Sequence, residues 1–105
     1  MSKWLVEKRL SQSAERLKQL RAELAVVDEQ LLFLSETVDE ARLRALVSET
    51  PLADKEHREA KKHADAMSRR RTEITTSIQD LERTQDELLD RLVEQRPNAA
   101  GGEAG

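Results

Sequence analysis

The fold of this chain is decided by the stretch Ser48-Glu49-Thr50-Pro51, close to the middle of the sequence. Thr50 is a favourable helix N-cap, because its hydroxyl can accept a hydrogen bond from a free backbone N–H of the first turn. Pro51 suits the first helical position, where its missing N–H costs nothing and its fixed φ matches the helix. Ser48 and Glu49 are then left to form a turn between two helices.

Both arms on either side of this turn are free of helix-breaking residues. The sequence predicts a first helix over about 2–48, a turn at about 48–51 and a second helix over about 51–95, within one hairpin domain (1–96). After that domain the periodic pattern stops, and the three Gly of the chain all follow. We expect residues 97–105 to form a disordered tail, because they offer too little apolar surface to offset the entropy of ordering.

Each arm carries apolar residues at the spacing of a coiled-coil heptad. On the first arm, the a and d positions are Val6, Leu10, Ser13, Leu17, Leu20, Leu24, Val27, Leu31, Leu34, Val38, Ala41 and Ala45. On the second arm, they are Ala53, His57, Ala60, Ala64, Met67, Arg71, Ile74, Ile78, Leu81, Gln85, Leu88 and Leu92. The heptad phase does not carry through the turn, which favours a chain that folds back on itself. We therefore predict an all-α fold, a long antiparallel two-helix coiled-coil hairpin.

The same positions predict the register of the hairpin. With the apex at Glu49, facing residues have numbers that add to 98, and each a position then lies opposite a d position. Leu20 faces Ile78, and the polar Ser13 falls opposite the polar Gln85. The single sum of 98 pairs every seam position of the first arm with a seam position of the second, which supports this register.

Charged residues are expected at the edges of the seam. Arg71 holds a seam position, where its methylenes can cover the facing apolar side chain while its head stays in water. Near the turn, Arg42 is expected to pair with Asp54, and Arg44 with Glu56. Each exposed ion pair contributes only ~0.2–1 kcal/mol, but both favour the same register.

Composition restricts the class of protein. Charged and hydrophobic residues each make up 37% of the 105 residues, and one Trp and one Phe are the only aromatics. A net charge of −3 gives no general attraction to nucleic acid or to an anionic membrane. The chain has no Cys, no signal-like apolar run and no stretch of ~20 apolar residues, so a cytoplasmic location without membrane contact is expected.

The first arm carries more apolar residues than its seam uses. Val26, Leu32 and Phe33 lie on its outer face at mid-length, whereas the outer positions of the second arm are mostly polar. A contiguous apolar surface of this kind marks an association site, and an isolated two-helix hairpin has a small core. We expect a homodimer in which first helices pair, giving a four-helix arrangement.

No catalytic or metal site is expected. His57 and His63 are six residues apart, which places them ~240° apart around a helix, so they cannot share a metal on one helix. Enzymatic chemistry needs convergent groups in a water-excluding pocket, which a two-helix hairpin does not provide. We therefore expect a non-enzymatic protein without a cofactor.

Arg69, Arg70 and Arg71 form the core of the one cationic cluster. Such a cluster could contact phosphates, but acidic residues are interleaved with it and no aromatic residue is near to stack on bases. A solvated helix face is the favoured interpretation, and nucleic-acid binding is not expected.

The turn offers a second candidate surface, a protruding tip with both apolar and acidic residues. Its members are Leu46, Val47, Glu49, Leu52, Asp54 and Glu56. The stretch from Glu49 to Lys62 resembles the helical hairpin of the Gre transcript-cleavage factors, although its acidic residues are spaced differently. That resemblance implies a tip that enters the secondary channel of RNA polymerase and helps to hold a catalytic Mg²⁺.

A broader resemblance covers the turn from Leu46 to Asp54 and its two Glu-, Arg- and Ala-rich arms. These are similar to small uncharacterised helical proteins of actinobacteria, which implies a partner or regulator in cell division, chromosome segregation or transcription. The predicted function is a protein–protein interaction module, with an RNA polymerase-binding transcription factor as the alternative. The sequence does not identify the partner protein.

Overall fold

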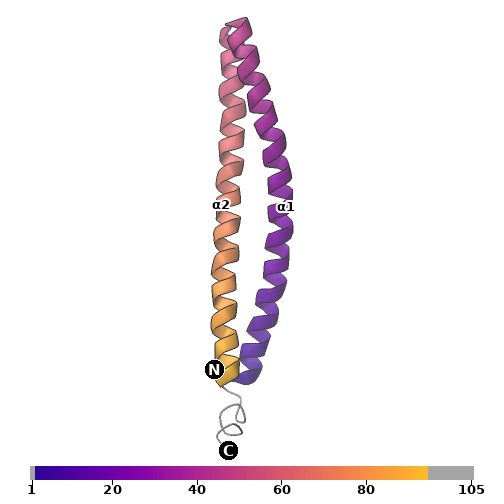
Figure 1. Cartoon of the computed structure of the whole chain (residues 1–105), viewed down its shortest axis with the longest axis vertical. Helices are drawn as coiled ribbons and strands as arrows, with labels where there is room; N and C mark the ends of the chain where they lie inside the picture. Colours follow the sequence, from indigo (N-terminus) through magenta and orange to yellow (C-terminus); the bar gives the residue numbers. More distant parts are fainter. Residues whose placement is uncertain (1, 95–105) are drawn as a thin grey trace, which may run out of the picture. The chain divides into compact units, whose positions relative to one another are not determined.

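The computed structural model describes residues 2–94, which form two long helices (Figure 1). Helix α1 spans Lys3–Ser48, and helix α2 spans Pro51–Glu94. The fold is all-α, as the heptads predict, and α2 folds back beside α1 as an antiparallel hairpin. The expected tail (97–105) and the last expected residue of the second helix lie outside the described residues.

Side-chain hydroxyls cap both helices. The Leu5 amide donates to Ser2 Oγ over 3.2 Å, and the Ala53 amide donates to Thr50 Oγ1 over 3.2 Å. Each bond satisfies one of the backbone donors that the first turn of a helix leaves free. The cap at Thr50 therefore starts α2 at Pro51, directly after the turn.

Glu49 makes the turn by adopting a left-handed conformation, with φ of 53°. A residue in this region directly after the last helical position is a common way to end a helix, and the position favours glycine. The Glu49 amide still donates to the carbonyl oxygen of Ala45 over 3.1 Å. The chain therefore reverses within two residues, at the cost of some backbone strain at Glu49.

The chain divides into two compact units, each with a part of both helices. The open-end unit contains residues 2–21 of the N-terminal side and 76–94 of the C-terminal side, and the turn unit contains residues 22–75. Within each unit the two helical segments lie side by side and run in opposite directions (Figure 1).

The seam of the open-end unit is made of large aliphatic side chains. Its buried members are Val6, Ser13, Leu17, Leu20, Ile78 and Leu88. The other seam residues of this unit, Leu10, Leu81, Gln85 and Leu92, are half-buried. The single buried polar member, Ser13, is the one that the heptad also places in the seam.

The seam of the turn unit is thinner on the α2 side. Its buried members are Val27, Ala41, Ala53 and Ile74. Its other seam residues are half-buried, and on α2 these are His57, Ala60, Ala64, Met67 and Arg71. Each position that the heptad assigns to the seam, in both units, is thus buried or half-buried.

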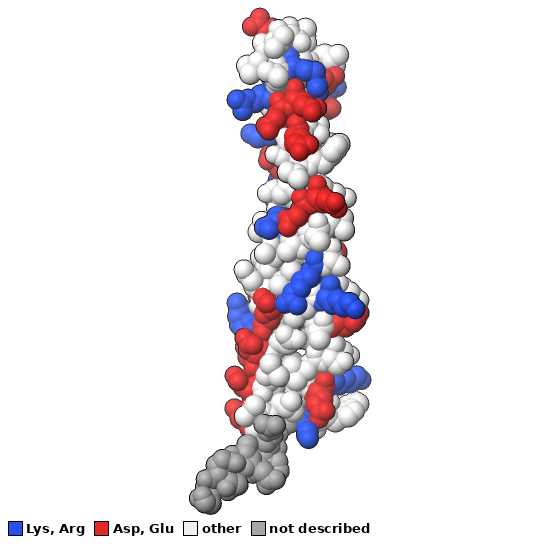
Figure 2. Space-filling model, turned by 45° about the vertical axis from the view of Figure 1, so that its right-hand side comes forward, with Lys and Arg blue, Asp and Glu red and all other residues white. Residues whose placement is uncertain are grey.

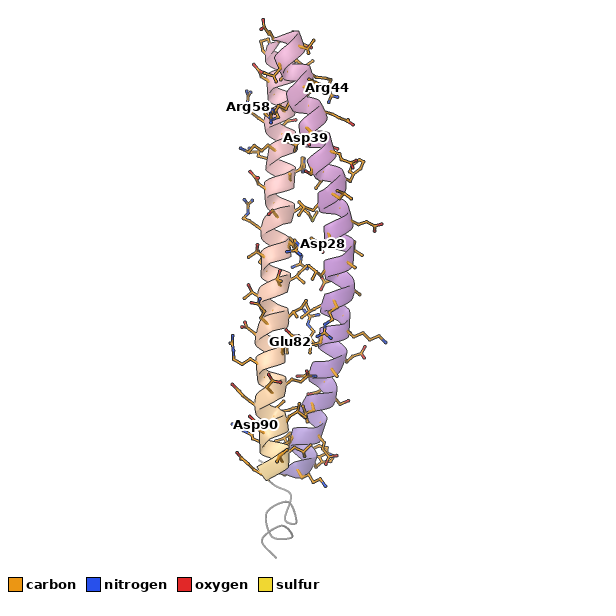
Figure 3. The ribbon with its side chains drawn as sticks, viewed as in Figure 1. Asp28, Asp39, Arg44, Arg58, Glu82 and Asp90 are labelled. Carbon is orange, nitrogen blue, oxygen red and sulfur yellow. The ribbon has the colours of Figure 1, made fainter. Side chains whose placement is uncertain are left out.

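Ion pairs join the two helices within each unit, and Figure 3 labels Glu82, a member of one of them. In the open-end unit, Arg21 Nη2 lies 3.1 Å from Glu82 Oε2. In the turn unit, Arg70 Nη2 lies 2.6 Å from Glu23 Oε1. The first pair joins e positions and the second joins g positions, which is the arrangement of an antiparallel pair.

The two ion pairs expected near the turn are not formed. Among residues 2–94, no ion pair within 4.0 Å joins Arg42 to Asp54 or Arg44 to Glu56. Each observed pair lies one heptad away from the position that the expected pairs assume: Arg21 reaches Glu82, which is later on α2, and Glu23 reaches Arg70, which is earlier. Arg42 consequently shares a groove with another cation, Lys61.

Arg71 also differs from expectation, because its head is bonded rather than only hydrated. Its Nε lies 2.5 Å from Oδ1 of Asp28, whose side chain lies between the helices in Figure 3. The hydrogen bond from Arg71, and then the charge of Asp28, raise the pKa of the guanidinium. The Arg71 side chain therefore extends from the seam to Asp28 at its edge, and Val27, next to Asp28 in the sequence, stays buried.

Candidate interaction surfaces

The first candidate surface is the outer face of α1 in the turn unit. Leu32 is 64% exposed and Phe33 is 68% exposed, and Val26 beside them is also exposed. We call these three residues the mid-helix patch. They hold b and c heptad positions, which point away from the seam, so the pairing of α1 with α2 leaves them uncovered.

A shallow groove runs beside the mid-helix patch. Its volume is about 440 Å³, and it is lined by Glu29, Gln30, Phe33, Leu34 and Met67. Two of these residues, Leu34 and Met67, belong to the seam, so apolar surface continues from the seam to the ring of Phe33. The groove therefore extends the apolar surface that a partner could cover.

The second candidate surface surrounds the turn, and we call it the tip patch. Leu46, Val47 and Leu52 are exposed, with Val47 at 78%, and they flank Glu49. Asp54 and Glu56 are exposed as well, on the first turns of α2. Apolar and acidic groups thus surround the residue whose backbone makes the turn.

Leu43 adds to this surface and was not predicted. It is 62% exposed and lines a groove with Asp39, Arg42 and Leu46. The signal was present in the heptad, because Leu43 occupies the f position, directly opposite the seam. A large apolar residue at an f position indicates a second contact face.

Acidic residues separate the mid-helix patch from the tip patch. Glu36, Asp39 and Glu40 occupy the outer positions of α1 between them, and all three are exposed. Figure 2 shows Asp and Glu side chains on the turn-side part of the face that it brings forward, with Lys and Arg beside them, and further Asp and Glu along the left edge of the lower part. The outer face of α1 in the turn unit is therefore both apolar and acidic.

The cationic cluster of α2 is partly engaged within the turn unit. Arg70 contacts Glu23 and also lies 3.8 Å from Glu73, while Arg71 bonds to Asp28. These contacts tie α2 to α1 and offset the positive charge that a phosphate would meet. The cluster thus acts in holding the helices together, a role that the sequence did not indicate.

A second groove, of about 550 Å³, lies along the other edge of the seam in the turn unit and is lined by apolar seam residues as well as by charged ones. His57, Arg42 and Lys61 line it together with Asp39 and Asp65. Charges of both signs alternate there, so the groove has no strong preference for a ligand of one sign. Among the residues that the structure describes, no three of His, Asp and Glu form a group that could hold a metal ion.

The open-end unit has exposed apolar residues of its own. Trp4 is 67% exposed, and Lys8 Nζ lies 5.1 Å from the centroid of its ring, within cation–π distance. On α2, Leu89 and Val93 are also exposed. Trp4 is thus a large exposed aromatic residue on the outer face of α1.

No protein-family model, curated protein or solved structure matches this chain. Neither described helix is long and apolar enough to cross a bilayer. The candidate surfaces therefore carry the functional argument by their own chemistry.

Proposed function

We propose that this protein is a non-enzymatic interaction module that associates with a second copy of itself through the outer face of α1. One observation carries the proposal. The turn unit exposes Leu32 and Phe33 although its own seam is formed without them. Contiguous apolar surface of this kind is more typical of an association site than of a free monomer surface.

The energetics favour the same surface. Burying Phe33 contributes on the order of 1.5–3 kcal/mol per copy by area, and a twofold-symmetric dimer uses the patch twice. Association would also cover the groove beside Phe33, which the hairpin leaves open. The dimer therefore adds the apolar core that the thin seam of the turn unit lacks.

Sedimentation velocity of wild type and Phe33→Glu tests the proposal. The variant removes the buried ring from the interface and places a charged side chain there in both copies, so we expect it to be a monomer at concentrations where wild type is a dimer. A wild type that stays monomeric at high concentration contradicts the proposal.

The chain offers a matched control for this experiment. Leu32 and Leu52 are the same residue type, with 64% and 66% exposure, but only Leu32 lies on α1. Leu32→Glu should weaken association, and Leu52→Glu should leave it unchanged. Equal effects of the two changes would show that general loss of apolar surface, rather than the α1 face, controls association.

We place the module among regulators of cell division or chromosome segregation, because its turn and arms resemble small helical proteins of actinobacteria. A tagged chain is then expected to recover a filament protein or a segregation ATPase from cells of that kind. Recovery that depends on Phe33 would mean that the dimer is the form the partner binds.

A second candidate function uses the tip patch. Glu49 holds a left-handed conformation that favours glycine, with Leu46 and Leu52 exposed around it, and strained residues of this kind concentrate at functional sites. This supports the alternative of a transcription factor that binds RNA polymerase through its tip. Recovery of polymerase by wild type and by Leu32→Glu, but not by Leu52→Glu, is the result expected of this alternative.

A further inference from the structure

The charges of α1 are unevenly distributed between the two units. Its part in the open-end unit (3–21) has six Lys or Arg and two Asp or Glu, whereas its part in the turn unit (22–48) has two and six. If two first helices paired in parallel, the acidic stretch of one copy would lie against the acidic stretch of the other, and like charges would repel. Antiparallel helices would bring the basic stretch of each copy against the acidic stretch of the other.

Apolar pairs on the outer face of α1 fit the antiparallel arrangement as well. Trp4-Leu5, Ala25-Val26 and Leu46-Val47 all hold b and c positions, and successive pairs are three heptads apart. The middle pair is equally far from the other two along the sequence. Reversing the helix end for end about that middle pair therefore superimposes apolar pair on apolar pair.

We propose that two copies associate through antiparallel first helices, with Ala25 and Val26 at the twofold axis. Trp4 of each copy then packs against Val47 of the other, and Leu5 against Leu46. This inference rests on the proposed function, since it specifies the orientation and register of the same α1 surface.

Charged outer residues agree with this register in most layers. Lys8 comes within about one helical turn of Asp39 and Glu40 of the other copy, and Lys18 within about one turn of Glu29 and Glu36. The ring of Phe33 falls opposite the methylenes of Lys18, which can cover it. Three layers bring like charges together and subtract from the gain: Glu15 opposite Glu36 and, beside the outer face, Arg9 opposite Arg42 and Glu23 opposite Asp28.

The length of α1 suits an interface of ordinary size. Three outer positions in each heptad of a 46-residue helix give roughly 20 residues per copy. A standard protein–protein interface uses about 20–30 residues on each side. The outer face of α1 alone is therefore large enough for an interface at the lower end of the usual size range.

Cysteine crosslinking distinguishes the two orientations, because the chain has no cysteine of its own. Ser11 and Glu40 are exposed polar residues that face each other in the antiparallel register. Ser11→Cys and Glu40→Cys chains, mixed and treated with a short bismaleimide, should give a covalent heterodimer. Each variant alone should give at least roughly tenfold less covalent dimer.

The outcomes separate this inference from the proposed function. If Ser11→Cys alone crosslinks as well as the mixture does, the helices are parallel and the inference is wrong, although the α1 dimer stands. If wild type does not associate at all, the proposed function is wrong, and this inference is wrong with it. If association depends on Phe33 but neither the mixture nor the single variants crosslink, the register is wrong.

Charge reversal supplies an independent test. Lys18→Glu should raise the dimer dissociation constant roughly tenfold at low salt, since it turns two attractions per copy into repulsions. Adding Glu36→Lys in the same chain should restore most of the affinity. Arg83→Glu, an equal change on the outer face of α2, is the matched control, and an equal loss of affinity there would overturn the charge argument.

Discussion

The open-end unit and the turn unit have the same two-helix architecture but place their apolar residues differently. In the open-end unit, large aliphatic residues such as Leu17, Leu20 and Ile78 are buried in the seam. In the turn unit, two of the four buried residues are alanines, Ala41 and Ala53. The turn unit also exposes more large apolar residues than the open-end unit does, and most of these lie on the outside of α1. One unit thus contains most of the hairpin's core, and the other presents most of its exposed apolar surface.

The two units also differ in the sign of the charge on each helix. In the open-end unit the α1 segment is basic and the α2 segment (76–94) is acidic, with two Lys or Arg and six Asp or Glu. In the turn unit α1 is acidic, and α2 supplies seven Lys or Arg against five Asp or Glu. Opposite charges therefore meet across the seam in both units. A single repeat pattern can thus place large aliphatic residues in the seam at one end of a hairpin and leave apolar residues exposed at the other.

Crosslinking across the seam has the largest expected effect, because it should be nearly complete or nearly absent. Cysteines at Leu20 and Ile78 in the open-end unit, and at Val38 and Ala60 in the turn unit, should form intrachain disulfides, since facing positions bring Cα atoms to ~5–7 Å. Leu20 with Leu81, one turn away, should react much less. Efficient reaction in only one unit would show that the two units differ in register as well as in composition.

Truncating one seam leucine in each unit should reveal the difference in core quality. Leu17→Ala in the open-end unit should lower the free energy of unfolding by about 2–5 kcal/mol, because Leu17 is 2% exposed. Leu31→Ala in the turn unit should cost clearly less, roughly 1–2 kcal/mol, because Leu31 is only half-buried. Urea unfolding followed by circular dichroism measures both. Equal losses would mean that the thin seam contributes as much as the thick one.

The cap of α2 should have a smaller effect, confined to the turn unit. Replacing Thr50 and Pro51 by Ala removes the bond to the Ala53 amide and should cost about 1 kcal/mol. Helix content by circular dichroism should stay nearly unchanged, since the open-end seam still holds the arms together. Complete unfolding would show that the hairpin depends on the turn for its stability and not on the open-end seam.

Periodicity alone was sufficient to find the seam, because burial in a two-helix hairpin depends on which side of the helix a residue occupies. Among the described residues outside the seam, four are half-buried and the others are exposed; the four are Leu5, Glu23, Thr37 and Thr75. Thr37 and Thr75 donate their hydroxyls to the carbonyl oxygens of Phe33 and Arg71, one turn earlier. Thus the fold could be predicted from residue positions without knowledge of side-chain conformations.

Ion pairs were harder to predict, and Arg42 and Arg71 show why. A long cationic side chain can reach several acidic residues, and exposed pairs differ by less than about 1 kcal/mol. Arg71 pairs with Asp28, whereas Arg42 lies beside Lys61 rather than on Asp54. The left-handed turn at Glu49 was also missed, since no glycine marked it. The exposed apolar surfaces could be predicted from the residues at outer helix positions. What binds to them depends on a second molecule, whose sequence is not in this chain.

Replacing Glu49 by Gly should stabilise the turn unit by about 0.5–1 kcal/mol. Glycine adopts φ near 53° without the steric cost that a side chain adds, which outweighs its greater freedom in the unfolded chain at this position. Chemical denaturation measures the gain, and Glu49→Ala serves as the control that removes the carboxylate but keeps the strain. A stabilised variant that also loses a tip-dependent partner would show that the carboxylate is kept for binding.

The smallest expected effect concerns the ion pair that joins the helices in each unit. Double-mutant cycles with alanine at Arg21 and Glu82, and at Glu23 and Arg70, should each give a coupling of about 0.2–1 kcal/mol, because all four side chains are partly exposed. The Glu23–Arg70 pair should have the larger coupling, since its atoms are closer and its side chains less exposed.

Salt should weaken both couplings, because ions screen exposed charges. If the Glu23–Arg70 coupling persists at about 1 M salt while the Arg21–Glu82 coupling disappears, the turn unit depends on charge for cohesion that its apolar seam does not supply. Equal couplings that vanish together would mean that both pairs are ordinary surface contacts. The cohesion of the turn unit would then have to come from its thin seam, or from the proposed association of its outer face with a second copy.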